Sequence, residues 1–300
     1  MTDTAAQSPE DIRPEWSDLD LWSTGDLVRL WADEEASVSR AITAAGASLV
    51  AAVDTVAERV AAGGRLIYVG AGTTGRLAWL DAVEVPPTFG SDPSLVQAVV
   101  AGGAKAFTSA IEADEDDAAT ARDALAQLAL TAADTVVCCS ASGRTPFVLA
   151  AAAYAREVGA RTIALVNAPG SALAQATDLA LEVLTGPEII AGSSRLKAGT
   201  SQKIVLNMLS TLLMVRLGHT YGNLMVGVQA DNLKLRARTR RIVEQATGAE
   251  PEAVEEMVAR TDGDLKLSIV ALLTGDDLPA ARARLDRAGG RVRAAIERSA

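Results

Sequence analysis

Short, uninterrupted apolar runs alternate with amphipathic stretches through the first two thirds of the chain. Stretches with helical spacing, such as residues 73–84 and 144–159, lie between these runs. Strands without polar alternation are typical of a parallel sheet covered by helices on both faces, so the pattern predicts an α/β fold. The predicted strands are residues 65–70, 94–102, 134–140, 161–167 and 178–184.

The sequence on both sides of this alternating region is helical. Residues 25–62 predict two helices, and from Thr200 the chain predicts a long apolar helix, then a helix over 228–248. Three short Ala-rich helices are expected after them, broken at Gly263, Gly275 and Gly289-Gly290. We therefore expect three parts: a mobile N-terminus (1–20), a main domain (21–222) and a helical C-terminal region (223–300).

Composition and charge narrow the function classes. A chain of 300 residues with 49% hydrophobic content can bury a sizeable core. Its net charge of −10 disfavours nucleic acid as a partner, since affinity for phosphate backbones requires clustered cations. No signal peptide and no apolar run of about 18 residues is recognisable, so we expect a cytoplasmic protein without a membrane partner. Cys138 and Cys139 are adjacent in a strand and are interpreted as small buried hydrophobic residues.

A glycine-rich turn follows the first predicted strand. Its sequence, GAGTTG over residues 70–75, formally matches the GxGxxG pattern of dinucleotide sites. Such sites need an acidic residue about 20 positions later, at the end of the next strand, to bind a ribose. The next strand ends VVAGGAK and offers no carboxylate there. The dinucleotide interpretation therefore lacks its second anchor.

Hydroxyl side chains in two strand-to-helix turns favour phosphate instead. The second turn reads SASGRTP over residues 140–146. Backbone amides at a helix N-terminus bind anions, and hydroxyls add donors without adding charge, although each turn alone is also compatible with an ordinary capped helix. Because turns at the carboxyl ends of parallel strands can meet in one crevice, the pair predicts a site for a terminal phosphate. The predicted binding residues are Gly72, Thr73, Thr74, Ser140, Ser142, Gly143 and Thr145.

A third stretch, GSSRLKAGT over residues 192–200, precedes the long apolar helix. It carries Ser194 and the cations Arg195 and Lys197, and it is placed to close the same pocket. The alternative is a basic loop on the surface. We include Ser194 and Lys197 among the predicted substrate-binding residues.

Two carboxylates are candidates for acid–base chemistry. Glu84 precedes Pro86, which is expected to end the helix, so Glu84 should lie at a helix C-terminus where the dipole raises a carboxyl pKa. A carboxyl that stays protonated near neutral pH can act as a general acid, and a solvated glutamate is the alternative. Glu115 lies in an acidic run, where like charges can create a base, although acids are also common in the first turn of a helix. The single histidine, His219, cannot form a familiar zinc site and is assigned to structure.

Taken together, these stretches resemble the N-acetylmuramic acid 6-phosphate etherases of the sugar isomerase (SIS) superfamily. The matching segments are VGAGTTGRLAWLDAVEVPPTFG, VVAGG, SASGRTPFVLAA, AGSSRLKAGTSQKIVLNMLST, YGNLMVGVQADN and LDRAGGRVRAAI. The resemblance implies a three-layer, parallel-sheet SIS domain with N-terminal helices and a small helical C-terminal region, in a homodimer. It implies a lyase that uses no metal or organic cofactor. The implied reaction cleaves the D-lactyl ether of the sugar 6-phosphate by elimination and then hydration, in the breakdown of cell-wall amino sugars.

The resemblance also implies roles for individual residues. Glu84 matches the acid that protonates the departing lactate, and Glu115 matches the residue proposed to remove the C2 proton. The hydroxyls matched to phosphate binding are those of Thr74, Ser140, Ser142 and Thr145.

The chain departs from the resembled pattern at several places. Thr74 replaces a usual Ser, Val85 a common Cys and Gly227 a common Asp, and the stretches Arg13–Trp16 and Ala32–Glu35 differ from the usual N-terminal motifs. An etherase for a related 3-O-substituted sugar phosphate is therefore an alternative. A non-catalytic sugar-phosphate regulator, an aldose–ketose isomerase and a nicotinamide enzyme are further alternatives.

Overall fold

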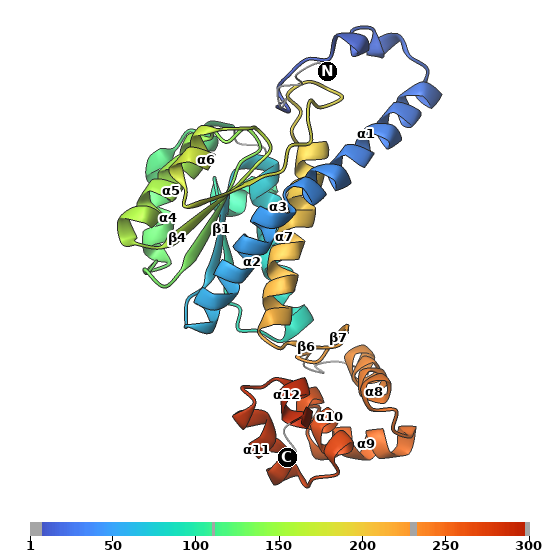
Figure 1. The fold of residues 1–300 in the computed structure, drawn as a ribbon. Helices are drawn as coiled ribbons and strands as arrows, with labels where there is room; N and C mark the ends of the chain where they lie inside the picture. The colour runs from blue at the N-terminus through green and yellow to red at the C-terminus, as the bar shows by residue number, and fades with distance from the viewer. Residues whose placement is uncertain (1–7, 110–111, 229–232, 298–300) are drawn as a thin grey trace. The chain divides into compact units, whose positions relative to one another are not determined.

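The computed structural model describes residues 8–109, 112–228 and 233–297 (Figure 1). The chain forms two compact units, each built from two segments. The first unit contains residues 1–83 and 94–210, and the second contains residues 84–93 and 211–300. The boundary expected near residue 222 falls inside the second unit.

The first unit is built on a parallel sheet of five strands in the order β2-β1-β3-β4-β5. All five predicted strands are present, as β1 (Leu66–Gly70), β2 (Val96–Val100), β3 (Thr135–Cys139), β4 (Arg161–Val166) and β5 (Leu179–Glu182). The sheet is buried on both faces because its strands are apolar at consecutive positions. The predicted α/β architecture is thereby confirmed.

Helices cover both faces of this sheet and make it the middle of three layers (Figure 1). On one face, alternate strand residues such as Ile67, Val69 and Cys138 pack against α4 (Ala118–Gln127), α5 (Pro146–Val158) and α6 (Ala172–Ala176). The opposite face lies against α2 (Gly46–Ala61), α3 (Gly72–Phe89) and α7 (Lys197–Arg216). Both cysteines are free and fully buried in β3, as expected.

The chain before the sheet is helical. Residues 8–21 contain the short 3₁₀ turns η1 (Pro14–Trp16) and η2 (Leu19–Leu21), and α1 (Thr24–Ala44) follows, capped by the Ser23 hydroxyl. The N-terminal segment is fixed where the Pro9 carbonyl accepts hydrogen bonds from the backbone N–H groups of Glu188 and Gly192. Two further 3₁₀ turns, η3 (Gly103–Phe107) and η4 (Glu112–Glu115), link β2 to α4.

Helix α3 does not end where the prolines predict. It runs through Pro86 and Pro87 to Phe89, so Glu84 lies inside the helix and not at its C-terminus. Each proline removes a helical hydrogen bond and costs about 3 kcal/mol. The apolar face continues past them, however, because Val85 before the prolines and Phe89 after them are both buried. Packing therefore overrides the local signal, and the prediction that Glu84 lies at the C-terminus of this helix is wrong.

The second unit consists of one β-hairpin and a group of helices packed around a small core. The hairpin pairs β6 (Thr220–Tyr221) with β7 (Leu224–Met225). The helices of the second unit are α8 (Leu233–Thr247), α9 (Pro251–Arg260), α10 (Leu265–Thr274), α11 (Leu278–Arg287) and α12 (Val292–Glu297). The expected glycine breaks therefore separate four short helices rather than three. Their core is aliphatic, centred on α10 residues such as Ile269 and Val270.

No single helix of the described residues is long and apolar enough to cross a membrane. Only α1 and α2 taken together, with a bend of 59° between them, meet the criteria of length and composition.

Candidate functional site

The two predicted phosphate-binding turns leave the sheet side by side. Strands β1 and β3 are neighbours, with Gly70 opposite Cys139, so both turns lie at the same carboxyl edge. In the strand order 2-1-3-4-5 this is the point where successive connections leave in opposite directions along the sheet. Ligands of open α/β sheets bind at such switch points. The topology therefore places the two turns where a small-molecule site is expected.

The first turn brings Gly72 against the carboxylate of Glu115. Gly72 has a positive φ of 53°, and a Cβ atom built there would lie 2.6 Å from Glu115 Oε1. The positive φ therefore favours glycine, and the carboxylate of Glu115 occupies the space beside it. The structure thus places one predicted catalytic acid directly at the turn that begins α3.

Arg76, one helical turn further along α3, holds the connection that leads to Glu115. Its Nε donates to the carbonyl of Ala106 at 2.6 Å, and its Nη2 donates to the carbonyl of Ser109 at 3.2 Å. These bonds tie the segment after β2 to the start of α3. Arg76 carries no sequence motif that indicates this role, because its carbonyl partners lie about 30 residues away in the chain.

Thr74 is committed to a buried chain of amide side chains. Its hydroxyl donates to Gln202 Oε1 at 2.7 Å, and Gln202 Nε2 donates to Asn167 Oδ1 at 3.0 Å. The direction of these bonds is fixed because Asn167 Nδ2 donates to the carbonyl of Val183, which can only accept. Thr74 is 8% exposed, and Gln202 and Asn167 are fully buried. Its role in phosphate binding remains a prediction, and in this arrangement its oxygen is left only as an acceptor.

The second turn is a cluster of hydroxyls. Ser140 Oγ lies 2.8 Å from Thr145 Oγ1 and 3.5 Å from Ser142 Oγ, and it accepts the backbone N–H of Gly143 at 3.1 Å. Thr145 is the N-cap of α5, yet its side chain does not cap the helix. By contrast, side chains cap α1, α4, α6, α10 and α11. Pro146 has no N–H, and the N–H of Val148 donates to the carbonyl of Thr145, so the start of α5 offers an anion the N–H of Phe147.

The third stretch reaches the first turn, but its lysine is already paired. A Cβ atom at Gly199 would lie 3.6 Å from Thr73 Cγ2, so the start of α7 borders this turn. Lys197 is 1% exposed, and its Nζ lies 2.6 Å from Glu34 Oε2. Glu34 also pairs with Arg13 at 3.3 Å. The two divergent N-terminal stretches thus meet at Glu34, which also pairs with Lys197, and the role of Lys197 in substrate binding stays a prediction.

Ser194 contributes backbone to the same stretch. Its carbonyl accepts the N–H of Gly199 at 2.9 Å, and its side chain is partly exposed. Like that of Lys197, its contact with substrate stays a prediction.

Glu84 is exposed on α3, ten residues after Thr74 on the same helix. By compactness Glu84 belongs to the second unit and Glu115 to the first. Their joint action on one substrate therefore remains a prediction. The structure brings together the first turn, Glu115, the second turn and the start of α7.

One turn before Glu84, a buried aspartate fixes α3. Asp81 accepts hydrogen bonds from Tyr68, Asn207 and Ser210 at 3.0, 2.6 and 3.0 Å. Burial raises the pKa of Asp81 above its ordinary value, although these three donors oppose the rise. The cluster joins β1, α3 and α7, and sequence patterns did not reveal it.

Comparisons with known proteins agree with this geometry. Residues 48–156 match the glucokinase regulatory protein N-terminal SIS domain, and residues 113–212 match the SIS domain. An N-acetylmuramic acid 6-phosphate etherase of Streptomyces avermitilis is 53% identical over 96% of this chain and 92% of its own length. Relatives with the same name from Rubrobacter xylanophilus and Mycolicibacterium smegmatis are 54% and 46% identical over 94% and 98% of this chain, and 93% and 99% of theirs. This chain belongs to the N-acetylmuramic acid 6-phosphate etherase family. The resemblance seen in the sequence is confirmed.

The first unit of this etherase-family chain has the SIS fold. A phosphoheptose isomerase from Francisella tularensis superposes with a TM-score of 0.53 at 17% identity, covering 64% of this chain and 98% of that chain. At this identity the likeness concerns the fold alone.

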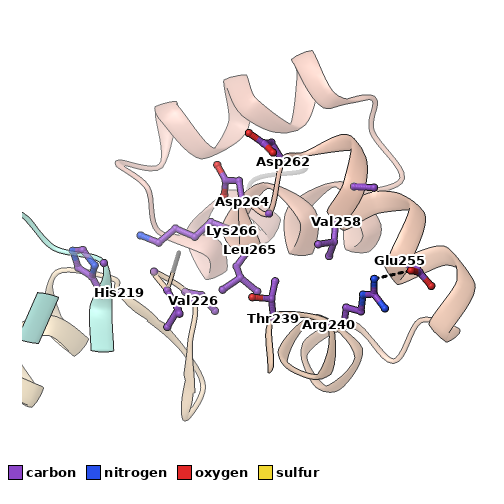
Figure 2. Close-up of a pocket in the computed structure, with 15 residues that line it drawn as sticks. His219, Val226, Thr239, Arg240, Glu255, Val258, Asp262, Asp264, Leu265 and Lys266 are labelled. Carbon is purple, nitrogen blue, oxygen red and sulfur yellow. Dashed lines mark ion pairs between the residues drawn. The ribbon is translucent and has the colours of Figure 1, made fainter. Parts of the chain in front are cut away.

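The second unit contains a cavity of about 760 Å³ (Figure 2). It is lined by apolar residues such as Val226 and Leu265 and by charged residues, several of which have partners. Arg240 pairs with Glu255 at 2.6 Å, and Lys266 donates to the carbonyl of Gly290 at 2.9 Å. None of the predicted catalytic or binding residues lines this cavity. His219 does, and its Nδ1 lies 2.8 Å from the carbonyl of Phe89.

Proposed function

We propose that this chain cleaves the D-lactyl ether of N-acetylmuramic acid 6-phosphate to N-acetylglucosamine 6-phosphate and D-lactate. The observation that carries the proposal is the carboxylate of Glu115 against Gly72, at the switch point of a SIS fold. Membership of the etherase family over nearly the whole chain supports this substrate.

In the proposed mechanism, the phosphate is bound by uncharged donors. The hydroxyls of Ser140, Ser142 and Thr145 and the backbone N–H group at the start of α5 surround the 6-phosphate. Phosphate binding then presents the C2 and C3 atoms of the open-chain sugar to the catalytic acids. At this stage the protein accelerates the reaction mainly by holding the reacting atoms in position.

The chemistry is an elimination followed by a hydration. Glu115 removes the C2 proton, which the C1 aldehyde acidifies, and the C3–O bond breaks to leave a C2=C3 double bond. Glu84 protonates the departing lactate oxygen. Water then adds its oxygen to C3 while a proton returns to C2, which gives the product sugar. One acid and one base are sufficient for both steps.

Release of D-lactate from N-acetylmuramic acid 6-phosphate by the pure protein tests the proposal. Glu84→Gln and Glu115→Gln should each lower kcat by about 10²- to 10⁴-fold, the usual contribution of a general acid or base. Binding of N-acetylglucosamine 6-phosphate should persist in both variants. Asp116→Asn is the matched control, because Asp116 is an exposed neighbour in the same acidic run, and it should keep full activity.

No lactate from the wild-type protein would reject the assignment. Full activity of either glutamine variant would remove that glutamate from the mechanism. Binding without turnover would indicate a regulator.

We further propose that the active form is a cytoplasmic homodimer. Its support is a group of exposed apolar side chains in the first unit, on α3, η3 and α7: Trp79, Leu80, Val83, Phe107 and Ile204. The ring centroids of Trp79 and Phe107 lie 4.4 Å apart. Helices α3 and α7 are joined by the hydrogen bond that Asn207 donates to Asp81. Large exposed apolar patches mark protein interfaces. The two free cysteines fit a reducing compartment.

A further inference from the structure

The second phosphate-type turn carries one charged side chain, that of Arg144. Its backbone N–H donates to Ser142 Oγ at 3.3 Å, between Gly143 with a φ of 63° and the N-cap Thr145. The guanidinium is exposed and, within the described part of the chain, makes neither a hydrogen bond nor an ion pair. The turn therefore fixes the backbone of an arginine whose five donors remain free.

The phosphate does not need this cation. Three hydroxyls and the uncapped start of α5 already supply uncharged donors around the proposed phosphate position. Backbone donors at a helix N-terminus bind anions without a charged side chain. Arg144 is thus available for a different group of the substrate.

The substrate of the proposed reaction carries a second anion, the carboxylate of its three-carbon ether group. This carboxylate must approach a protein of net charge −10, at a site that already contains the carboxylate of Glu115. Removing a carboxylate from water is costly unless a cation or several donors replace the water. A guanidinium meets this need with two parallel hydrogen bonds, which an ammonium group cannot match.

Two other cations close to the two turns are already engaged. Lys197 is buried and pairs with Glu34 at 2.6 Å. Arg76 donates to two backbone carbonyls, those of Ala106 and Ser109. Arg195 is exposed, but it lies outside both turns, in the stretch before α7.

From these observations we infer that Arg144 binds the carboxylate of the ether substituent and so selects which 3-O-substituted sugar phosphates are cleaved. The inference rests on the proposed function. It assigns the substrate's two anions to different groups of one turn, the phosphate to its hydroxyls and the carboxylate to its arginine. Substituents that end in a carboxylate are then favoured over neutral ethers of the same size.

The test compares Arg144→Gln and Arg144→Lys with Arg40→Gln as the matched control, because Arg40 is an exposed arginine on α1, outside both turns and the stretch before α7. Lactate release gives KM and kcat, and N-acetylglucosamine 6-phosphate serves as a competitive inhibitor that has the phosphate but lacks the ether carboxylate. For Arg144→Gln we expect KM to rise about 10- to 100-fold, as for the loss of a charge-assisted pair. The inhibition constant of the product should change by less than about twofold, because phosphate binding is untouched. Arg144→Lys should recover part of the loss, and Arg40→Gln should behave as wild type.

A rise of the inhibition constant in step with KM would overturn the inference, since Arg144 would then serve the phosphate. An unchanged KM in Arg144→Gln would overturn it as well. Failure of the proposed function is distinguishable, because it appears as absence of lactate from the wild-type protein. Because Arg144 is exposed, its variants are expected to fold, and matching thermal unfolding curves confirm this.

Discussion

At the scale of single residues, Gly227 lies where two backbones approach too closely for a side chain. A Cβ atom there would lie 1.9 Å from the carbonyl oxygen of Phe89. We predict that Gly227→Ala lowers the free energy of unfolding by about 1–3 kcal/mol, the usual cost of overpacking. Gly46→Ala is the control, because a Cβ atom at Gly46 meets nothing within 4 Å. Urea unfolding measures both, and equal stability of the two variants would contradict the prediction.

Sequence patterns predicted the kinds of side chain at the site better than their partners. The hydroxyls of Ser140, Ser142 and Thr145 cluster as the turn motif indicated. Lys197 was predicted as a pocket cation, yet its charge is paired with Glu34, 163 residues away in the chain. Gln202 carries no local motif and was missed. Partners so distant in sequence are set by tertiary packing, which spacing along the chain does not encode.

At the scale of elements, the strands were predictable and one helix end was not. The strands are buried on both faces, so their apolar runs are continuous and easily recognised. The predicted end of α3 is wrong because Pro86 is a strong local signal, whereas burial of Val85 and Phe89 depends on contacts elsewhere. Local propensity decides an element only where tertiary packing does not oppose it.

An ion pair clamps the beginnings of two central strands and should make stability depend on pH. Asp134, just before β3, lies 2.7 Å from Arg65 Nη2, just before β1. Burial raises the pKa of Asp134, but hydrogen bonds from Arg65 and Thr131 outweigh it, so the folded pKa lies below the ordinary 3.8. A lowered folded pKa stabilises the protein above the unfolded value, and this stabilisation is lost as pH falls through the folded one.

We therefore predict that Asp134→Asn lowers the free energy of unfolding by about 3 kcal/mol at pH 7, since one partner of a nearly buried pair is removed. The difference from wild type should shrink as pH falls below about 4, where the wild-type carboxyl also becomes neutral in the unfolded chain. Urea unfolding of both proteins at pH 7, 5 and 3.5 measures this difference in the free energy of unfolding. A difference that stays constant with pH would show that the charge of Asp134 does not matter.

At the scale of the whole molecule, the apolar side chains on α3, η3 and α7 bear on assembly. Leu80 is 44% exposed beside Trp79 and Val83, on a helix whose other side is held in the first unit by Asp81. Water contact with so much apolar surface is unfavourable, and burial in a dimer would remove it. Twofold dimers are the commonest form of homo-oligomer. The chain has a mass of 31.0 kDa, so light scattering should give about twice this value.

Leu80→Glu should convert this dimer to monomer, because the charge would have to be buried without a partner. Val50→Glu is the control, since Val50 is 61% exposed on α2 and lies outside this apolar group. If Glu84 and Glu115 act on one substrate only in the assembled dimer, lactate release should fall with the dimer fraction and recover at high protein concentration. A monomeric wild-type protein with full activity would contradict the dimer proposal and leave the etherase proposal intact.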